Sequence, residues 1–261
     1  MFPLIFEIPV FGGIRIYTYG VLVALAFVVG LSWTVHEAKR VNISSEKILD
    51  LGFYIILSAL VGSRILYVMI EFKKYWAHPL DILKIWEGGL VFYGGLLGAI
   101  GTSFLYIRKQ HMSFLQIADL FSPGIALGHS IGRLGCFAAG CCYGRSALGS
   151  VFAVFYPPSR FTLAPPGVPL YPSQLFESAA ALGIFFLLLG IRRKKKFNGQ
   201  IFLAYLLLYG IARLFLETFR GTSVQGFIIP DLLSSSQLIS LVLIGIAVIG
   251  IIKLRHPGRP A

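Results

Sequence analysis

Residues 201–220 read IFLAYLLLYGIARLFLETFR. Nearly all of Ile201–Phe219 is apolar, and a helix of about 20 residues spans the roughly 30 Å hydrocarbon core of a bilayer. The segment therefore predicts a transmembrane helix. Arg213 and Glu217 interrupt it, and each ionisable residue at the centre of such a helix costs about 2.5–3.5 kcal/mol on insertion scales. Residues of this kind usually face an interior cavity.

The polar residues of this segment share one face. Tyr209, Arg213, Glu217 and Arg220 lie at offsets of 4, 8 and 11 residues, which places them within an arc of about 80° on a helix. Two interpretations are open. The stripe is either a structural Arg–Glu pair that fixes helix packing, or an anion site in which Glu217 orients an arginine.

Six further segments have a similar length and composition. Long apolar runs without ten-residue alternation favour helices over a β-barrel. The sequence predicts an all-α integral membrane protein with about seven transmembrane helices. The other six segments are Tyr17–Val35, Leu49–Ile70, Leu90–Ile107, Phe114–Ile131, Gln174–Ile191 and Gln237–Ile252.

The composition of the whole chain agrees with this class. Of 261 residues, 56% are hydrophobic and 13% are charged, and the mean hydropathy is +0.79. Soluble domains carry about 25% charged residues, so a soluble protein is excluded. The net charge of +12 does not indicate a nucleic-acid partner, because basic residues on a membrane protein more often mark its cytoplasmic loops.

The basic residues predict the orientation in the membrane. They gather in alternate connections, and the block Arg192–Lys196 is the hardest to translocate. We expect the N-terminus outside and the C-terminus in the cytoplasm. The short connections predict a single membrane-embedded domain, residues 1–261, with an ordered outer loop at about residues 132–173. The remaining cytoplasmic basic residues are Lys39, Arg40, Lys47, Arg108, Lys109, Lys253, Arg255 and Arg259.

Two further arginines are candidates for binding an anion. Arg133 lies between Gly132 and Gly135, which leave its guanidinium accessible, and a guanidinium holds a phosphate through two parallel hydrogen bonds. By the expected topology Arg133 and Arg213 share one leaflet, so both arginines can hold one phospholipid head group. Arg64 is either a further contact of this kind, an interhelical partner or a snorkelling side chain.

A glycine-rich segment opens the expected helix Leu90–Ile107. Residues 87–96 read EGGLVFYGGL, and the paired glycines on both sides of Tyr93 suggest a tight turn or a close helix contact. The phenol of Tyr93 is then either a functional group at the outer level of the membrane or an ordinary member of the interfacial aromatic belt.

Three cysteines lie within seven residues, at Cys136, Cys141 and Cys142. An odd number excludes complete internal pairing. The thiols can pack the loop, or Cys136 can form a disulfide with Cys141 or Cys142 in an oxidising exterior. A metal site would need a fourth ligand, for which His129 is the near candidate.

Taken together, these residues resemble the bacterial prolipoprotein diacylglyceryl transferases. The glycine–arginine segment GRLGCF is the most specific part of the resemblance. The matching segments are residues 17–20 (YTYG), 61–64 (VGSR), 88–95 (GGLVFYGG), 132–137 (GRLGCF), 171–177 (YPSQLFE) and 209–213 (YGIAR) with Glu217 and Arg220.

The chain also departs from the pattern of this family. The best-known version of the signature has Asn at the position of Cys136, a second Asn at Ala139 and Glu at Cys141. It has His at the position of Tyr93 and commonly His at Tyr171. The arginines are intact, so the departures concern the group that takes the thiol proton.

The resemblance implies transfer of the diacylglyceryl group of phosphatidylglycerol to the lipobox cysteine of preprolipoproteins, in the bacterial cytoplasmic (inner) membrane. It implies that Arg133 and Arg213 bind the phosphate and that Glu217 orients Arg213. Tyr93 as the proton acceptor is a separate hypothesis, since the chain departs from the family at this position. It calls for no cofactor, metal or nucleic acid. The other substrate-binding candidates are Arg64, Tyr19, Tyr209, Arg220, Gly132, Gly135, Cys136, Gln174 and Glu177.

Other classes remain for comparison. A retinal-type photoreceptor would need a lysine inside the last helix, and Gln237–Ile252 contains none. A transporter or non-catalytic phospholipid-binding protein would use the same arginines to hold a head group without breaking it. The same chemistry on another thiol acceptor is the remaining alternative.

Overall fold

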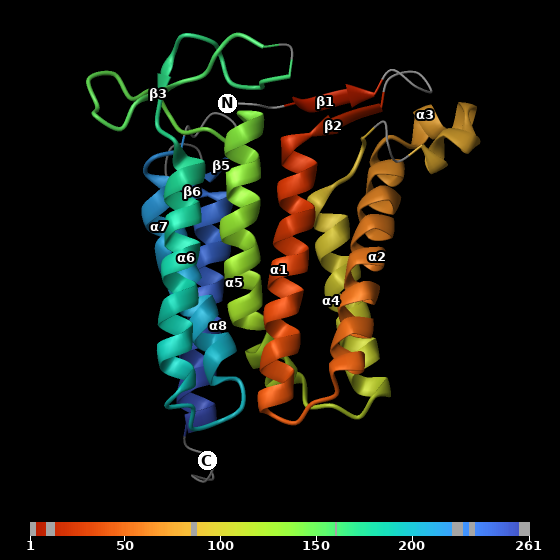
Figure 1. Ribbon diagram of the computed structural model, residues 1–261, viewed down its shortest axis with the longest axis vertical. Helices are drawn as coiled ribbons and strands as arrows, with labels where there is room; N and C mark the ends of the chain where they lie inside the picture. The colour runs from red at the N-terminus through yellow and green to blue at the C-terminus, as the bar shows by residue number, and fades with distance from the viewer. Residues whose placement is uncertain are drawn as a thin grey trace. The chain divides into compact units, whose positions relative to one another are not determined.

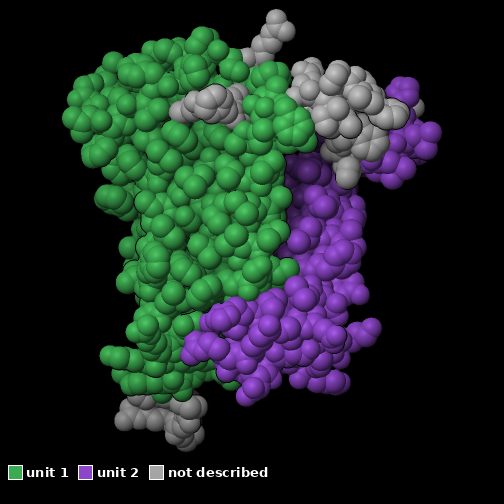
Figure 2. Space-filling model, viewed as in Figure 1, with its two compact units in different colours: residues 1–34, 118–261 green, residues 35–117 purple. Residues whose placement is uncertain are grey.

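The computed structural model describes residues 4–8, 14–84, 88–159, 161–220, 227–229 and 233–255. Glu87 and Arg259, which entered the predictions above, lie outside these residues. The chain forms two compact units, coloured separately in Figure 2. Unit 1 comprises residues 1–34 and 118–261, and unit 2 comprises residues 35–117.

Unit 1 is built from long helices (Figure 1). Helix α7 packs against both α6 and α8. Five buried side chains from α5, α6 and α7 form the apolar core of this unit. The helices are α1 (Thr18–Arg40) and α5 (Phe114–Ala139), whose larger parts belong to this unit, with α6 (Ser173–Arg192), α7 (Gln200–Glu217) and α8 (Ser235–Arg255).

Small residues let α1 and α5 approach each other closely. A Cβ atom on Gly30 would lie 2.7 Å from the carbonyl oxygen of Gly124, and one on Gly124 would lie 2.4 Å from Thr34 Oγ1. Close backbone approach through small residues is the usual packing mode of membrane helices.

Helix α5 is longer than the sequence predicts. Phe114–Ile131 was the expected span, but the helix continues to Ala139 and ends where Gly140 adopts a positive φ of 65°. The segment before Gly140 contains no residue that breaks a helix. The loop that the sequence predicts on the outer side, called the outer loop below, therefore begins after α5 and not at residue 132.

Asp119, which weakens the apolar pattern of α5, has a structural role. Its carboxylate accepts hydrogen bonds from the backbone N–H groups of Gly199 (2.7 Å) and Phe202 (2.8 Å), and it pairs with Lys195 Nζ at 2.9 Å. The first N–H groups of a helix have no partner within the helix, so Asp119 caps α7 from another helix. Part of the basic block Arg192–Lys196 is thus used within the fold.

The outer loop is ordered by its own small core. Strands β3 (Val154–Phe155) and β4 (Pro169–Leu170) pair antiparallel. The buried side chains of Tyr156, Ala164 and Leu170 pack together beneath them.

Unit 2 contains α2 (Ser45–Ile70), α3 (Phe72–Ala77), the 3₁₀ helix η1 (Pro79–Leu83) and α4 (Phe92–Lys109). Helices α2 and α4 pack against each other through glycines. A Cβ atom on Gly94 would lie 2.3 Å from the carbonyl oxygen of Gly62, so the two backbones are nearly in contact.

Short strands qualify the all-α prediction. Besides β3 and β4, the described residues contain two more two-stranded antiparallel sheets, β1 (Leu4–Ile8) with β2 (Ile14–Tyr17) and β5 (Phe227–Ile229) with β6 (Leu233–Ser234). The sheet of β1 and β2 precedes α1, and the other two sheets lie in connections between helices. In all three, strand pairing satisfies backbone groups that no helix satisfies.

Five helices among the described residues are long and apolar enough to cross a membrane: α1, α2, α6, α7 and α8. Helices α4 and α5 occupy the other two expected segments, and α5 is more polar because it carries Asp119, His129 and Arg133. Large apolar side chains are exposed on the outer faces of the helices, as expected of a surface that faces lipid. The chain is a mostly helical membrane protein.

Candidate functional site

Three arginines of unit 1 converge on one carboxylate, that of Glu177 in the first turns of α6. Arg213 Nη1 lies 2.6 Å and Arg220 Nη1 lies 3.2 Å from Glu177 Oε1. The guanidinium of Arg133, from α5, pairs with the other oxygen, Oε2. The side chain of Glu177 is 4% exposed, so these groups meet in the interior of the unit.

A second carboxylate, that of Glu217, orients Arg213. Glu217 lies one turn after Arg213 on α7, and its Oε2 is 2.9 Å from Arg213 Nη2. Ser234 Oγ donates to Glu217 Oε1 at 3.0 Å, and Arg213 Nη2 donates to Ser236 Oγ at 3.0 Å. We call these three arginines, Arg133, Arg213 and Arg220, together with Glu177 and Glu217, the arginine cluster.

The charges of the arginine cluster do not cancel. Counted over the residues that the structure describes, three guanidinium groups and two carboxylates sum to +1. Burying charges is costly even when they are paired, so an unbalanced positive charge in this setting favours an added anion. Burial lowers the pKa of Arg220, but Glu177 opposes this effect and the guanidinium stays charged.

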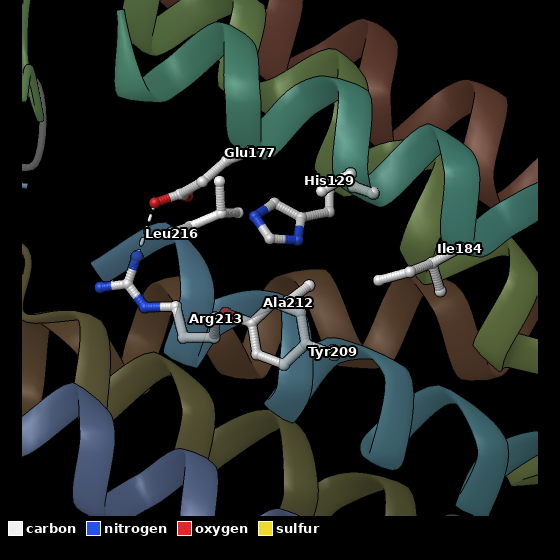
Figure 3. Close-up of a pocket in the computed structure, with 9 residues that line it drawn as sticks. His129, Glu177, Ile184, Tyr209, Ala212, Arg213 and Leu216 are labelled. Atoms are coloured by element: carbon white, nitrogen blue, oxygen red, sulfur yellow. Dashed lines mark hydrogen bonds and ion pairs between the residues drawn. The ribbon is translucent and has the colours of Figure 1, made fainter. Parts of the chain in front are cut away.

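A small cavity lies beside the arginine cluster (Figure 3). His129, Tyr209 and the Arg213–Glu177 pair line it, and the rings of His129 and Tyr209 lie 5.6 Å apart. His129 Nε2 accepts a hydrogen bond from Arg133 Nε at 3.4 Å. The cavity holds about one water molecule.

Arg133 lies within α5 and does not follow it as the sequence suggests. Its side chain is 16% exposed, against 9% for Arg213. A Cβ atom on Gly132 would meet nothing within 4 Å, whereas Gly135 packs against Tyr19 and Leu22 of α1. Gly132 thus leaves open space on the turn that carries Arg133, and Gly135 serves helix packing.

Gln174 has a different role from the predicted one. It is fully buried, and its Nε2 donates to the carbonyl of Cys141 at 2.7 Å and to the hydroxyl of Tyr156 at 3.0 Å. These bonds fasten the loop after α5 to the start of α6, so Gln174 positions that loop.

Arg64 also departs from its predicted role. It lies in unit 2, and all five of its N–H groups donate to backbone carbonyls. Its guanidinium stacks over the rings of Tyr67 and Tyr75 at 5.7 and 5.2 Å. A guanidinium engaged in this way has no donor left for a head group. The carbonyls belong to Asp81, Ile82, Lys84, Gly88 and Gly89, at 2.7–3.3 Å.

The paired glycines before Tyr93 serve this arrangement. Gly88 and Gly89 have φ values of 89° and 74°, and a Cβ atom on Gly89 would lie 2.8 Å from Arg64 Nη1. Only glycine combines this backbone conformation with this close approach. Tyr93 itself, in the first turn of α4, is 57% exposed.

The cysteines are thiols, so neither of the two possible disulfides has formed. The Sγ atom of Cys136 lies 4.0 Å from Arg133 Nη1.

The two remaining tyrosines of the predicted site lie in different surroundings. Tyr19 on α1 is 44% exposed. The ring of Tyr209 stacks on that of Tyr205, with 5.9 Å between the ring centroids.

The sequence includes Glu177 among the binding candidates but indicates no partner for it, so it does not predict that Glu177 is the centre of the site. The available signal was a carboxylate near the start of an apolar, membrane-length helix, where an unpaired charge is costly. The partners, Arg133 and Arg220, lie 44 and 43 residues away in the chain, beyond the reach of any helical spacing.

Comparisons with known proteins identify the family of the chain. A sequence model of the prolipoprotein diacylglyceryl transferase family matches residues 3–253. The chain is 37% identical over 244 residues to the phosphatidylglycerol–prolipoprotein diacylglyceryl transferase of Finegoldia magna, covering 93% of each chain. It is 35% identical over 248 residues to enzyme 2 of that name from Clostridium perfringens, again covering 93% of each.

A third relative, the phosphatidylglycerol–prolipoprotein diacylglyceryl transferase of Clostridium tetani, is 32% identical over 257 residues. That alignment covers 98% of this chain and 99% of the relative. The matches span both units and the outer loop, so they include every residue of the arginine cluster. The chain belongs to the prolipoprotein diacylglyceryl transferase family.

Proposed function

We propose that this protein transfers the diacylglyceryl group of phosphatidylglycerol to the thiol of the lipobox cysteine in preprolipoproteins. The observation that carries the proposal is the arginine cluster, a buried group of five charges with a net charge of +1. Relatives that align over nearly the whole chain bear the name of this activity.

The reaction makes and breaks one bond each. The sulfur of the acceptor cysteine bonds to the carbon that joins the diacylglyceryl group to the phosphate. The bond between this carbon and its phosphate oxygen breaks. The products are a thioether and glycerol phosphate, and the thiol proton passes to a base. The phosphate group starts as a diester with one negative charge and leaves as a monoester with about −1.5 to −2 charge near neutral pH.

This change in charge suits the arginine cluster. A net charge of +1 balances the diester, and its attraction grows as negative charge develops on the leaving oxygen. Preorganised donors aimed at developing charge lower the barrier of a reaction. Arg133 and Arg213 bind the phosphate, Arg220 supports them, and Glu217 holds Arg213 in position.

The other candidates have lesser roles. Tyr209 and Tyr19 line the path of the lipid, with Gly132 and Cys136 on the turns around Arg133. Arg64 holds the segment before α4 through its carbonyl contacts and does not touch the lipid.

Tyr93 is the proposed acceptor of the thiol proton, because it occupies the position at which the best-known version of the family's signature has His. A phenol with a pKa near 10 needs a nearby cation to act near neutral pH. If Tyr93 is the base, Tyr93→Phe lowers kcat about 100-fold or more with little change in KM for the lipid, measured by initial rates. An unchanged rate assigns the base elsewhere.

The protein acts as a multi-pass protein of the bacterial cytoplasmic membrane. Seven spans are proposed, the five apolar helices with α4 and α5, the N-terminus outside and the C-terminus in the cytoplasm. The distribution of basic residues supports this orientation, since Lys and Arg are enriched in cytoplasmic loops.

The test uses purified protein in phosphatidylglycerol vesicles with a lipobox peptide. The wild type adds a diacylglyceryl mass to the peptide and releases glycerol phosphate. Arg133→Ala lowers kcat about 10²–10³-fold, the usual cost of losing one donor that stabilises developing charge. Arg145→Ala is the matched control, because Arg145 is an exposed arginine of the outer loop. We expect this variant to keep the wild-type rate.

Two results would overturn the proposal. Folded wild-type protein that binds the lipid but adds no mass to the peptide is a phospholipid-binding protein. Equal mass gain on a thiol peptide without the lipobox sequence would identify another thiol acceptor.

A further inference from the structure

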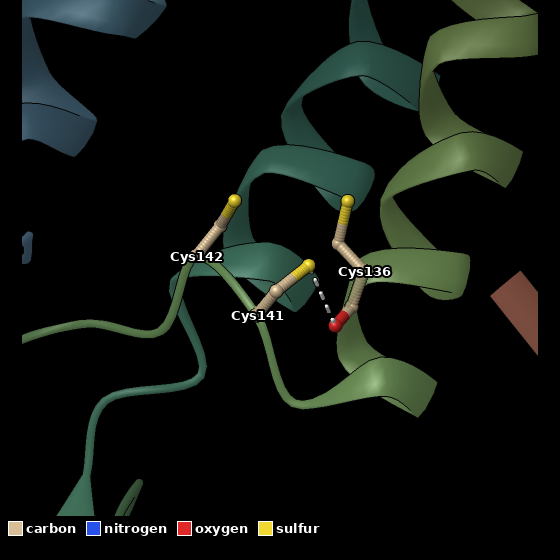
Figure 4. A group of neighbouring side chains, drawn as sticks. All are labelled: Cys136, Cys141 and Cys142. Atoms are coloured by element: carbon tan, nitrogen blue, oxygen red, sulfur yellow. Dashed lines mark hydrogen bonds between the residues drawn. The ribbon is translucent and has the colours of Figure 1, made fainter. Parts of the chain in front are cut away.

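The three thiols of the chain gather at one point of unit 1. Cys136 lies in the last turn of α5, and Cys141 and Cys142 follow the turn at Gly140. Their Sγ atoms all lie within 4.8 Å of one another (Figure 4). The proposed reaction uses none of these three side chains as a ligand or nucleophile.

The backbone holds the thiols in this arrangement. Cys141 N–H donates to the carbonyl of Cys136 at 3.1 Å. The carbonyls of Cys141 and Cys142 accept hydrogen bonds from Gln174 Nε2 (2.7 Å) and Ser173 Oγ (2.8 Å), and both of these donors are buried. The convergence of the three sulfurs is therefore built into the fold.

Two backbone positions confirm that the turn is specified. Gly140 and Cys142 both have positive φ values, 65° and 57°. A Cβ atom on Gly140 would lie 2.5 Å from Thr162 Cγ2, so only glycine fits. A cysteine in the left-handed region is uncommon, and here that conformation brings its sulfur to the other two.

Arginines lie beside the thiols. Arg133 Nη1 is 4.0 Å from Cys136 Sγ. A cation beside a cysteine favours its thiolate form. The thiolate is the form of cysteine that binds metals.

We propose that Cys136, Cys141 and Cys142 form a binding site for a single thiophilic cation of the Zn²⁺ or Cu⁺ class. Zinc–sulfur bonds of about 2.3 Å place sulfurs about 4 Å apart, so the group needs to contract only slightly. Three thiolates with a divalent ion carry a charge of −1, and the guanidinium of Arg133 lies beside them. Cu⁺ accepts soft thiolate ligands, and Zn²⁺ adds water or an incoming group as a fourth ligand.

His129 is not part of this ligand set. Its Nε2 accepts a hydrogen bond from Arg133 Nε, and its ring lies against Tyr209 in the small cavity. The site consists of sulfur ligands alone, and Cys142, the exposed member, gives an ion access to it.

The test uses full-length protein in detergent micelles, purified without a histidine tag, reduced, and then kept free of oxygen. Zn²⁺ is titrated against a chromophoric chelator, and Co²⁺ serves as a spectroscopic probe of thiolate coordination. The wild type binds one ion per chain and shows thiolate-to-cobalt charge-transfer absorption. Cys142→Ser weakens binding more than about 100-fold. Loss of a residue that only hydrogen-bonds to a metal ligand costs about 10–100-fold in affinity, and Cys142 is itself a proposed ligand. Ser146→Ala, an exposed change in the same loop, binds as the wild type.

A second measurement needs no variant. Alkylation followed by mass spectrometry adds three labels to the reduced protein, and one equivalent of Zn²⁺ protects the thiols. The proposal is overturned if binding is not stoichiometric, if a variant with all three cysteines replaced by serine binds equally well, or if all three thiols react at the same rate with and without Zn²⁺. Because no lipid or peptide is present, these results are independent of the transferase assay.

Discussion

The carboxylate of Glu177 allows three guanidinium groups to lie together in an apolar bundle. Arg133, Arg213 and Arg220 reach it from α5, from α7 and from the residue where the chain leaves α7. Like charges at this separation repel strongly in a medium of low dielectric constant, and the shared anion offsets that repulsion. Glu177 is therefore both a structural centre and the group that an arriving phosphate must partly replace.

Glu177→Gln tests this dual role. The variant keeps the shape of the side chain but removes the charge on which the three arginines converge. Removing one partner from a buried ion pair costs about 3–5 kcal/mol, so we expect a lower unfolding temperature in detergent micelles and a loss of transferase activity. Glu46→Gln, on an exposed carboxylate of α2, is the control and leaves both unchanged. A Glu177→Gln protein with wild-type stability would mean that the arginines do not depend on this anion.

Helix α7 begins at a cap that belongs to another helix. Asp119 of α5 accepts from Gly199 N–H and Phe202 N–H, and Lys195 completes the contact. The cap fixes the start of the helix that carries Arg213 and Glu217 at its other end.

Asp119→Ala removes this cap. Losing a capping carboxylate costs about 0.5–2 kcal/mol, and the buried N–H groups left without an acceptor add to that cost. We expect a lower unfolding temperature and faster hydrogen exchange at Gly199 and Phe202, measured by mass spectrometry. Lys194→Ala, an exposed lysine of the same turn, changes neither. Equal exchange in both variants would show that water replaces the carboxylate.

The glycines of α4 offer a matched pair for helix packing. A Cβ atom on Gly94 would lie 2.3 Å from the carbonyl oxygen of Gly62 on α2, whereas one on Gly101 would meet nothing within 4 Å. Gly94→Ala forces α2 and α4 apart and costs about 1–3 kcal/mol. Gly101→Ala is neutral or stabilises the helix by up to about 1 kcal/mol. The measurement is the unfolding temperature of each variant relative to the wild type. An equal decrease in both variants would contradict close packing at Gly94.

The orientation of the whole chain is open to a direct test. Cys142 in the outer loop should react with a membrane-impermeant maleimide in intact cells when Cys136 and Cys141 are replaced by alanine. Lys194→Cys, in a chain without other cysteines, should react only after the membrane is permeabilised, because the basic block is expected in the cytoplasm. Labelling of position 194 in intact cells would reverse the proposed topology.

Most of the secondary structure follows from local composition. All seven expected segments coincide with long helices, because an apolar run of membrane length must satisfy its own backbone groups as a helix. The exact ends do not follow in the same way. Helix α5 passes the expected boundary at Ile131, since its end depends on where Gly140 can adopt a positive φ.

The candidate site was only partly predictable. The stripe of Arg213 and Glu217 is visible in one helix, because helical spacing places residues four apart on one face. The role of Arg64 is not visible in the sequence, because its partners are backbone carbonyls. Every residue has such a carbonyl, so no sequence pattern marks these partners. The roles of Gln174 and Asp119 were hidden for the same reason: each binds backbone groups of a distant segment.

Composition and apolar run length, which are properties of continuous segments, were enough to establish a helical membrane protein and the residues with unusual charge. Which charges meet was decided by the packing of α5, α6 and α7, because ion pairs across more than 40 residues depend on how helices lie side by side. The convergence of Cys136, Cys141 and Cys142 likewise depends on a turn that Gln174 and Ser173 hold from another helix.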